Sequence, residues 1–133
     1  MTTELPTIHP SVPAADEAAI RATMDDYYLG WFDADGERMA RALHPELAKR
    51  GWLRLGDGDP ILDVDTFDTM TGLAAAGRGR RTDPAERAYS VRIDDVDGDI
   101  ATGTVHSALY IDYLHLVRTS DGWRILNALW RPG

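Results

Sequence analysis

The sequence contains no cysteine among its 133 residues. A disulfide framework, a thiolate metal site and a cysteine nucleophile are therefore excluded. It also lacks any apolar run near the roughly 18 residues that a membrane-spanning helix needs. Residues 1–13 show neither the basic nor the apolar region of a signal peptide. These absences predict a cytoplasmic protein that does not contact a membrane.

Basic residues are scarce. The chain has 14 Lys and Arg against 22 Asp and Glu, a net charge of −8. A nucleic-acid-binding protein normally carries a basic patch, because neutralising phosphates supplies much of its affinity. The one basic cluster, Arg78, Arg80 and Arg81, lies in a glycine-rich stretch. It is interpreted either as a solvated loop or as a loop that contacts an anion, and nucleic acid is not expected.

Motifs that dictate a reaction are also missing. The sequence has no glycine-rich phosphate loop, no nucleophile elbow and no visible serine–histidine–aspartate arrangement. No His-x-x-x-His spacing supports a metal site, and Asp57 and Asp59 lack the closing glutamate of a calcium loop. We therefore expect neither a metal nor a cofactor.

The patterning that is present predicts one domain, residues 14–133, preceded by a flexible arm, residues 1–13, that is rich in proline. Helical spacing predicts helices near 16–33, 35–44 and 66–76, and Pro45 must end the second. Short strands are expected at 49–55 and 61–64. The first helix has an apolar, aromatic face made of Ile20, Met24, Tyr27, Tyr28 and Trp31.

The C-terminal part alternates apolar and polar residues and predicts strands near 88–96, 100–108, 112–119 and 123–130. A single strand from 100 to 119 would span roughly 66 Å, although a domain of this length has a radius of gyration of only about 14 Å. The chain must therefore fold back near 108–112. The predicted fold class is α+β, with three helices packed on a curved antiparallel sheet.

The last strand is apolar on both sides, which is unusual for a sheet with one wet face. Its two sides carry Trp123, Ile125 and Leu129, and Leu126, Ala128 and Trp130. One face is expected to be covered by the helices. The other, outer face is expected to be covered by a second subunit, so the sequence predicts a homodimer.

Four stretches resemble the nuclear transport factor 2-like (SnoaL-like) superfamily, with its cone-shaped, cystatin-like fold. The resemblance is closest to its "putative lumazine-binding" branch and covers about residues 14–131. The stretches are Tyr28-Leu29-Gly30-Trp31, Ala42-Leu43-His44-Pro45-Glu46-Leu47, Asp112-Tyr113-Leu114-His115-Leu116-Val117 and Asp121-Gly122-Trp123-Arg124-Ile125-Leu126-Asn127.

The resemblance implies a pocket between the concave face of the sheet and the first helices, and usually a homodimer. It implies no single activity, because the superfamily includes isomerases, dehydratases, cyclases, binding proteins and scaffolds. The ligand expected for such a pocket is small and hydrophobic or heteroaromatic.

His44 and Asp112 are the candidate catalytic residues. His44 ends a helix before a proline, where an imidazole could act as a general base or bind a ligand; it could equally satisfy a carbonyl at the helix end. Asp112 is a carboxylate in an apolar stretch, which is costly unless the group is paired or exposed. It could abstract a proton next to a carbonyl, or it could cap the fold-back turn.

The candidate ligand-binding residues are aromatic or polar side chains on the predicted helix and strands. For the aromatic residues the alternative is packing in the core, and for Asn127 it is an amide satisfied within the sheet. They are Tyr28, Trp31, Trp52, His106, Tyr110, His115, Asn127 and Trp130.

Three functions remain open on the sequence alone. The first is a homodimeric protein that binds a small molecule in an apolar pocket. The second is a cofactor-independent isomerase, dehydratase or cyclase that uses His44 and Asp112 as acid and base on a hydrophobic carbonyl compound. The third is a module whose sheet face binds a partner.

Overall fold

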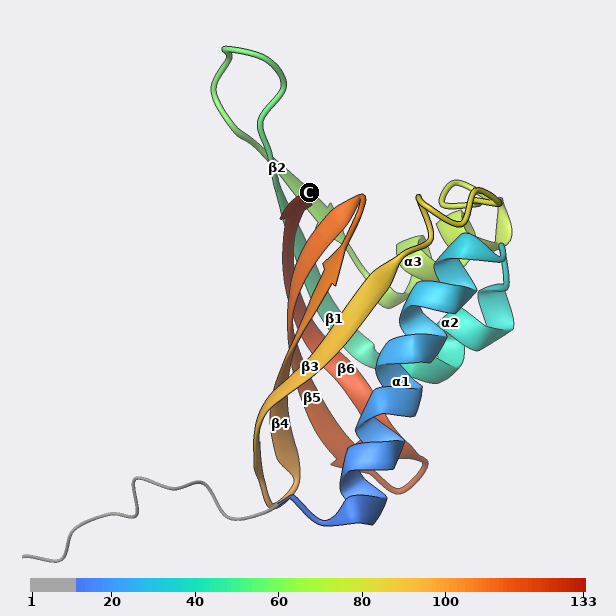
Figure 1. Ribbon diagram of the computed structural model, residues 1–133, viewed down its shortest axis with the longest axis vertical. Coiled ribbons are helices and arrows are strands. Elements are labelled where there is room, and N and C mark those ends of the chain that lie inside the picture. Colours follow the sequence, from blue (N-terminus) through green and yellow to red (C-terminus); the bar gives the residue numbers. More distant parts are fainter. Residues whose placement is uncertain (1–11) are drawn as a thin grey trace, which may run out of the picture.

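A computed structural model describes residues 12–133 and shows helices packed on one face of a single curved sheet (Figure 1). The helices are α1 (Ala14–Phe32), α2 (Gly36–Ala42) and α3 (Phe67–Ala75). The strands are β1 (Leu43–Leu53), β2 (Ile61–Asp65), β3 (Tyr89–Asp97), β4 (Ile100–Ser107), β5 (Tyr110–Thr119) and β6 (Gly122–Pro132). The predicted arm, 1–13, lies outside the described residues except for Val12 and Pro13.

Helix α1 supplies most of the helical side of the core. Its apolar face repeats at helical spacing, and Ile20, Met24, Tyr27 and Tyr28 are all buried against the sheet. This confirms the predicted face of the helix. No helix in the described part of the chain is long and apolar enough to cross a membrane.

The four C-terminal strands form successive antiparallel pairs, as predicted. Side chains alternate between the two faces, so Asp112, Leu114 and Leu116 of β5 point toward the helices, whereas Tyr113 points away. The fold-back occurs at Ala108 and Leu109, between β4 and β5. It is held by the Ser107 hydroxyl, which bonds to the backbone of Tyr110.

Strand β1 differs from the prediction in length and in direction. It begins at Leu43, directly after α2, because Pro45 disfavours helical geometry at the preceding residue, His44. It runs parallel to β6, so the six-stranded sheet is mixed, with the order β2-β1-β6-β5-β4-β3. The sequence pattern identifies β1 and β6 as strands but does not show that they pair.

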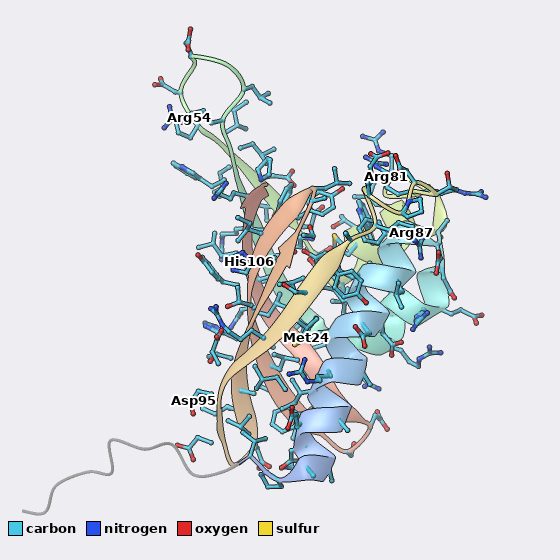
Figure 2. The ribbon with its side chains drawn as sticks, in the orientation of Figure 1. Met24, Arg54, Arg81, Arg87, Asp95 and His106 are labelled. Atoms are coloured by element: carbon cyan, nitrogen blue, oxygen red, sulfur yellow. The ribbon has the colours of Figure 1, made fainter. Side chains whose placement is uncertain are left out.

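The two faces of the sheet have different surroundings. Met24 lies between α1 and the sheet, whereas His106 and Asp95 project from the face opposite α1, α2 and α3, here called the outer face (Figure 2). The hairpin that joins β1 to β2 extends beyond the rest of the sheet and carries Arg54 directly after the end of β1 (Figures 1 and 2). The concave side therefore contains the core and the cavity described next.

Candidate functional site

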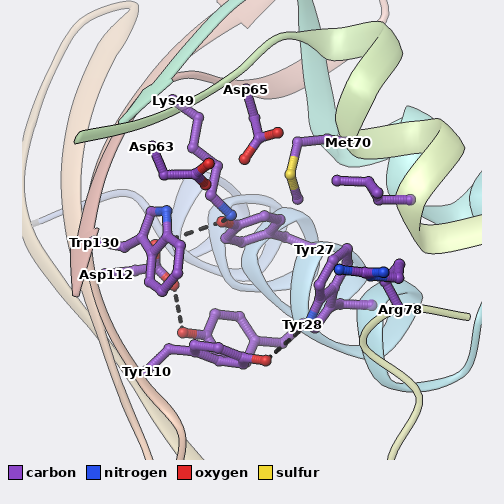
Figure 3. A pocket seen from close by; sticks show the side chains of 12 residues that line it. Tyr27, Tyr28, Lys49, Asp63, Asp65, Met70, Arg78, Tyr110, Asp112 and Trp130 are labelled. Atoms are coloured by element: carbon purple, nitrogen blue, oxygen red, sulfur yellow. Dashed lines mark hydrogen bonds between the residues drawn. The ribbon is translucent and has the colours of Figure 1, made fainter. Parts of the chain in front are cut away.

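A cavity of about 300 Å³ lies between α1, α3 and the concave side of the sheet (Figure 3). Each of the strands β1, β2, β5 and β6 contributes at least one side chain to its wall. Its volume is at the lower end of the range of small-molecule sites. The lining residues are Tyr27, Tyr28, Trp31, Lys49, Asp63, Asp65, Met70, Leu73, Arg78, Tyr110, Asp112 and Trp130.

A chain of buried polar groups crosses this cavity. The Lys49 ammonium donates to the Tyr27 hydroxyl over 2.5 Å, and that hydroxyl donates to Oδ1 of Asp112 over 3.4 Å. The Tyr28 hydroxyl donates to Oδ2 of Asp112 over 2.5 Å. Strand β1, helix α1 and strand β5 are thus joined through one carboxylate, which we call the Lys49–Tyr27–Asp112–Tyr28 relay.

Strand alternation explains why Asp112 is buried. It occupies the same face of β5 as Leu114 and Leu116, and only 3% of its surface is exposed. A buried carboxylate is tolerated when it is hydrogen-bonded, and the two tyrosine hydroxyls meet that need. The alternative role for Asp112, capping the fold-back turn, does not fit this placement.

Burial determines the protonation tendencies of the relay. It raises the pKa of Asp112, although the Lys49 cation and the two tyrosine hydroxyls act in the opposite direction. Burial lowers the pKa of Lys49, against the attraction of Asp112. Burial and the nearby carboxylate raise the pKa of Tyr27 and of Tyr28, so both phenols keep their protons and act as donors.

Aromatic rings form the walls of the cavity beside the relay. The Trp31 indole N–H donates to the Tyr110 hydroxyl over 3.2 Å. The Tyr110 ring meets Trp130 edge to face, with 5.6 Å between ring centroids. Trp31 comes from α1, Tyr110 from β5 and Trp130 from β6, so the walls assemble only in the folded chain.

Charged side chains from β2 and from the loop after α3 complete the lining. Asp63 and Asp65 face the cavity from β2, because they alternate with the exposed Leu62 and Val64. Burial and the neighbouring Asp65 raise the pKa of Asp63. Arg78 is exposed and contributes to the lining from the loop, whereas Arg80 and Arg81 of the same arginine cluster are not among the lining residues.

The structure brings five of the sequence-predicted site residues together around this cavity. They come from one helix and two strands and lie on the concave side of the sheet (Figure 3). These residues are Asp112, Tyr28, Trp31, Tyr110 and Trp130.

The other predicted site residues lie elsewhere. His44 is at the start of β1, outside the cavity lining, and its Nδ1 accepts a bond from the backbone N–H of Glu46. Trp52, His106, His115 and Asn127 lie on the outer face, where Asn127 Nδ2 is 3.3 Å from His115 Nδ1.

Their placement has a physical reason. Adjacent residues of a strand point to opposite faces, so a shift of one residue exchanges the faces. A register irregularity in β6 makes Ile125 the partner of Leu116 and Asn127 the partner of His115. Ile125 and Asn127 would share a face in a regular strand. Because of the irregularity, Ile125 is buried and Asn127 lies on the outer face. Among residues 12–133, no group of three metal-ligating side chains is placed to hold an ion.

Sequence reasoning missed Lys49, Tyr27 as a polar member of the site, and the charged lining from β2. A signal for Lys49 was present: it is the only lysine in the chain, and every other basic residue is arginine. The two-residue period also places Lys49 on the same face of β1 as the buried Leu47 and Gly51. A lone lysine between buried positions indicates an unusual environment.

Comparisons with known proteins agree with the fold. A family model described as "Putative lumazine-binding" matches residues 15–131. An NTF2-like protein of unknown function from Silicibacter pomeroyi has a TM-score of 0.71 at 19% identity, over 90% of this chain and 98% of that one. A second such protein, from Methylobacillus flagellatus, has a TM-score of 0.68 at 18% identity, over 94% and 98% of the two chains.

A ketosteroid isomerase-like protein from Erwinia carotovora has a TM-score of 0.60 at 17% identity, over 90% of this chain and 97% of that one. No curated protein matches the chain. At these identities the structural matches establish the fold, which is NTF2-like and cystatin-like.

Proposed function

The chain belongs to the "putative lumazine-binding" family, and we propose that its cavity binds a flat heteroaromatic molecule with ring carbonyl and N–H groups. The observation that carries this proposal is that aromatic walls and a buried polar relay line the same cavity. Sites for small molecules typically combine apolar walls with a few polar groups that fix orientation.

Each part of the cavity has a role in this binding mode. The rings of Trp31, Tyr110 and Trp130 offer flat apolar surface to a planar ligand. The Lys49 ammonium can donate to a ring carbonyl, and Asp112 can accept from a ring N–H through the lone pairs that Tyr27 and Tyr28 leave unused. The relay is preformed, so a ligand does not have to order it.

Binding is tested by calorimetric titration of the purified full chain with lumazine, a pteridinedione. We expect saturable binding with one ligand per chain. Asp112→Asn should weaken it by about tenfold or more, because a charge-assisted hydrogen bond is replaced by a neutral one and about 1.4 kcal/mol is a factor of ten.

Two substitutions outside the cavity are the matched controls. Trp52→Phe alters a tryptophan of the outer face, and His44→Ala removes an imidazole that does not line the cavity. Both should leave the affinity unchanged. The proposal fails if lumazine and related flat heteroaromatic compounds do not bind, or if Trp52→Phe weakens binding as much as Asp112→Asn does.

The acid/base alternative required His44 and Asp112 in one site. His44 does not line the cavity that contains Asp112, and its Nδ1 accepts a hydrogen bond from the backbone N–H of Glu46. Binding is therefore the function that the geometry supports better.

We further propose that the chain forms a homodimer through the outer face of the sheet. A row of paired residues crosses this face: Val64 is opposite Arg50, Arg50 is opposite Leu129, and Leu129 is opposite Tyr113. Val64, Leu129 and Tyr113 are 57%, 53% and 57% exposed. Three of the four residues in this row are apolar and exposed, and exposed apolar side chains grouped on one face support an interaction surface there.

The charges on the outer face favour a second copy as the occupant. Arg50 and Arg131 lie toward its β1 side, and Asp95 and Asp97 lie on β3 at the opposite side. A two-fold axis parallel to the strands would place the basic side of one sheet over the acidic side of the other. Such an isologous contact is self-complementary.

A further inference from the structure

Lys49 differs from the arginines of the chain in its side-chain chemistry and in its position. All the other basic residues are arginine, whereas Lys49 is 8% exposed and lines the cavity. If the cavity needed only a fixed positive charge, arginine would supply one that does not titrate in proteins. The primary amine is the chemistry that lysine adds, because a neutral amine is a nucleophile and guanidinium is not.

The contacts of the amine suit a nucleophile. Its nitrogen lies 2.5 Å from the Tyr27 hydroxyl, 4.9 Å from the centroid of the Tyr27 ring and 5.4 Å from that of Trp130. None of the ion pairs formed within residues 12–133 includes Lys49. An apolar wall on one side and a hydroxyl on the other leave the nitrogen facing the cavity (Figure 3).

The relay offers a place for the proton that the ammonium must lose. The groups that act on Lys49 are Asp112 from β5, Asp65 and Asp63 from β2, and the Tyr27 hydroxyl from α1. Burial lowers the pKa of Lys49 and raises that of Asp112, so both shifts favour transfer of a proton from the amine to the carboxylate. The Tyr27 hydroxyl lies between the two groups and connects them.

We propose that Lys49 forms a covalent imine with aldehydes or ketones that enter this cavity, with flat aromatic carbonyl compounds fitting best. The inference uses the cavity of the proposed function but does not depend on lumazine, whose ring carbonyls are amide-like and do not form imines. The aromatic walls hold the ring of the ligand, and the carbonyl carbon lies at the amine.

The reaction balances without any redox partner. The lone pair on Nζ forms a bond to the carbonyl carbon, and a proton moves from nitrogen to oxygen to give a carbinolamine. Asp112 supplies a proton through Tyr27, the carbon–oxygen bond breaks and water leaves. The iminium nitrogen then returns a proton to Asp112. The net change is amine plus carbonyl compound to imine plus water.

The test is reductive trapping with 2-naphthaldehyde, a flat bicyclic aldehyde, and sodium cyanoborohydride, which reduces an imine to a stable amine. The purified full chain is treated at pH 7, and peptide mapping by mass spectrometry separates adducts on Lys49 from adducts on the N-terminal amine. We expect an adduct on Lys49. Lys49→Arg, which keeps the charge, should remove that adduct.

The variant Arg54→Lys provides an internal control that does not depend on how Lys49→Arg folds. It adds an exposed amine on the hairpin that joins β1 to β2, outside both the cavity and the proposed dimer interface. An exposed lysine is about one part in 2,500 neutral at pH 7, and each unit of pKa lowering raises that fraction about tenfold. In this variant Lys49 should therefore be labelled faster than the amine introduced at position 54, with the difference shrinking as the pH approaches 10.

Equal or slower labelling of Lys49 would overturn the inference. Naphthaldehyde that binds, as seen by quenching of tryptophan fluorescence, but leaves Lys49 unmodified would overturn the imine and leave the cavity intact as a binding site. If neither naphthaldehyde nor lumazine binds, the imine and the proposed function fail together. If lumazine alone binds, only the imine fails.

Discussion

Two glycines allow the tryptophan walls of the cavity to lie where they do. A Cβ atom on Gly51 would be 2.6 Å from Cε2 of Trp130, and one on Gly79 would be 2.1 Å from Cε2 of Trp31. Contacts this short do not occur between real atoms, so neither position tolerates a side chain without moving the indole. The shape of the cavity therefore depends on residues that contribute no side chain to it.

Replacing Gly51 tests this dependence. Gly51→Ala should displace Trp130, lower the free energy of unfolding by about 1–3 kcal/mol through overpacking, and weaken lumazine binding. Urea unfolding and calorimetric titration measure the two effects. Gly58→Ala is the control, because the nearest atom to a Cβ there is the Leu55 carbonyl oxygen at 3.5 Å. Equal effects from the two substitutions would show that Gly51 has no special role.

The sequence predicts a polar site residue only where a charged side chain lies within an apolar stretch. Asp112 could be predicted, because a carboxylate inside an apolar strand must have a partner. His115 and Asn127 could not be assigned correctly, because their face depends on a register irregularity in β6 that no local pattern shows. Lys49 could have been predicted from its uniqueness, but its hydroxyl partner, Tyr27, comes from a helix distant in sequence.

At the scale of elements, α3 places Met70 and Leu73 in the cavity wall, and its start is fixed by a capping box. The Thr66 hydroxyl accepts from the backbone N–H of Thr69 over 3.2 Å, and the Thr69 hydroxyl accepts from the backbone N–H of Thr66 over 2.7 Å. Asp65, one residue before this cap, accepts from the Thr69 hydroxyl and faces the cavity.

Removing the cap should destabilise the chain. Thr66→Ala leaves a backbone N–H of the first turn without its acceptor, so the free energy of unfolding should fall by about 1 kcal/mol. Thr71→Ala is the matched control, because its hydroxyl bonds to the Phe67 carbonyl within the same helix and alanine has the higher helix propensity. Thermal and urea unfolding measure the free energy of unfolding of the two variants and of the unmodified chain. A loss for Thr71→Ala as large as that for Thr66→Ala would contradict the role of the cap.

The elements themselves and the antiparallel pairs of the last four strands were largely predictable, whereas the pairing of β1 with β6 was not. The fold-back between β4 and β5 followed from chain length alone, because a strand through residues 100–119 could not fit in a domain of this size. Helix α1 was predicted from apolar and aromatic residues that recur at helical spacing. The parallel pairing of β1 with β6 joins distant parts of the chain, so only the folded structure shows that Lys49 lies opposite Ala128 and near the cavity.

At the scale of the whole molecule, the helices cover one face of the sheet and leave the other without cover within residues 12–133 (Figure 1). Strands β5 and β6 carry apolar residues on both sides, and the structure buries only one side of each. The predicted sides of β6 were wrong, because the register irregularity places Leu129 on the outer face although Trp123 and Ile125 are buried. Leu129 and Tyr113, which are opposite each other on β6 and β5, are 53% and 57% exposed. They lie in the central strands of the sheet, where a partner sheet would bury them most fully.

The homodimer is tested by sedimentation velocity of the full chain over a range of concentrations. Leu129→Glu would place a charge in the centre of the proposed interface and repel its symmetry mate, so we expect the dissociation constant of the dimer to rise by roughly 30-fold, about 2 kcal/mol. Leu55→Glu is the control, because Leu55 is also exposed but lies on the hairpin beyond β1. A wild-type chain that stays monomeric, or a Leu55→Glu dimer weakened as much as Leu129→Glu, would contradict an interface centred on β5 and β6.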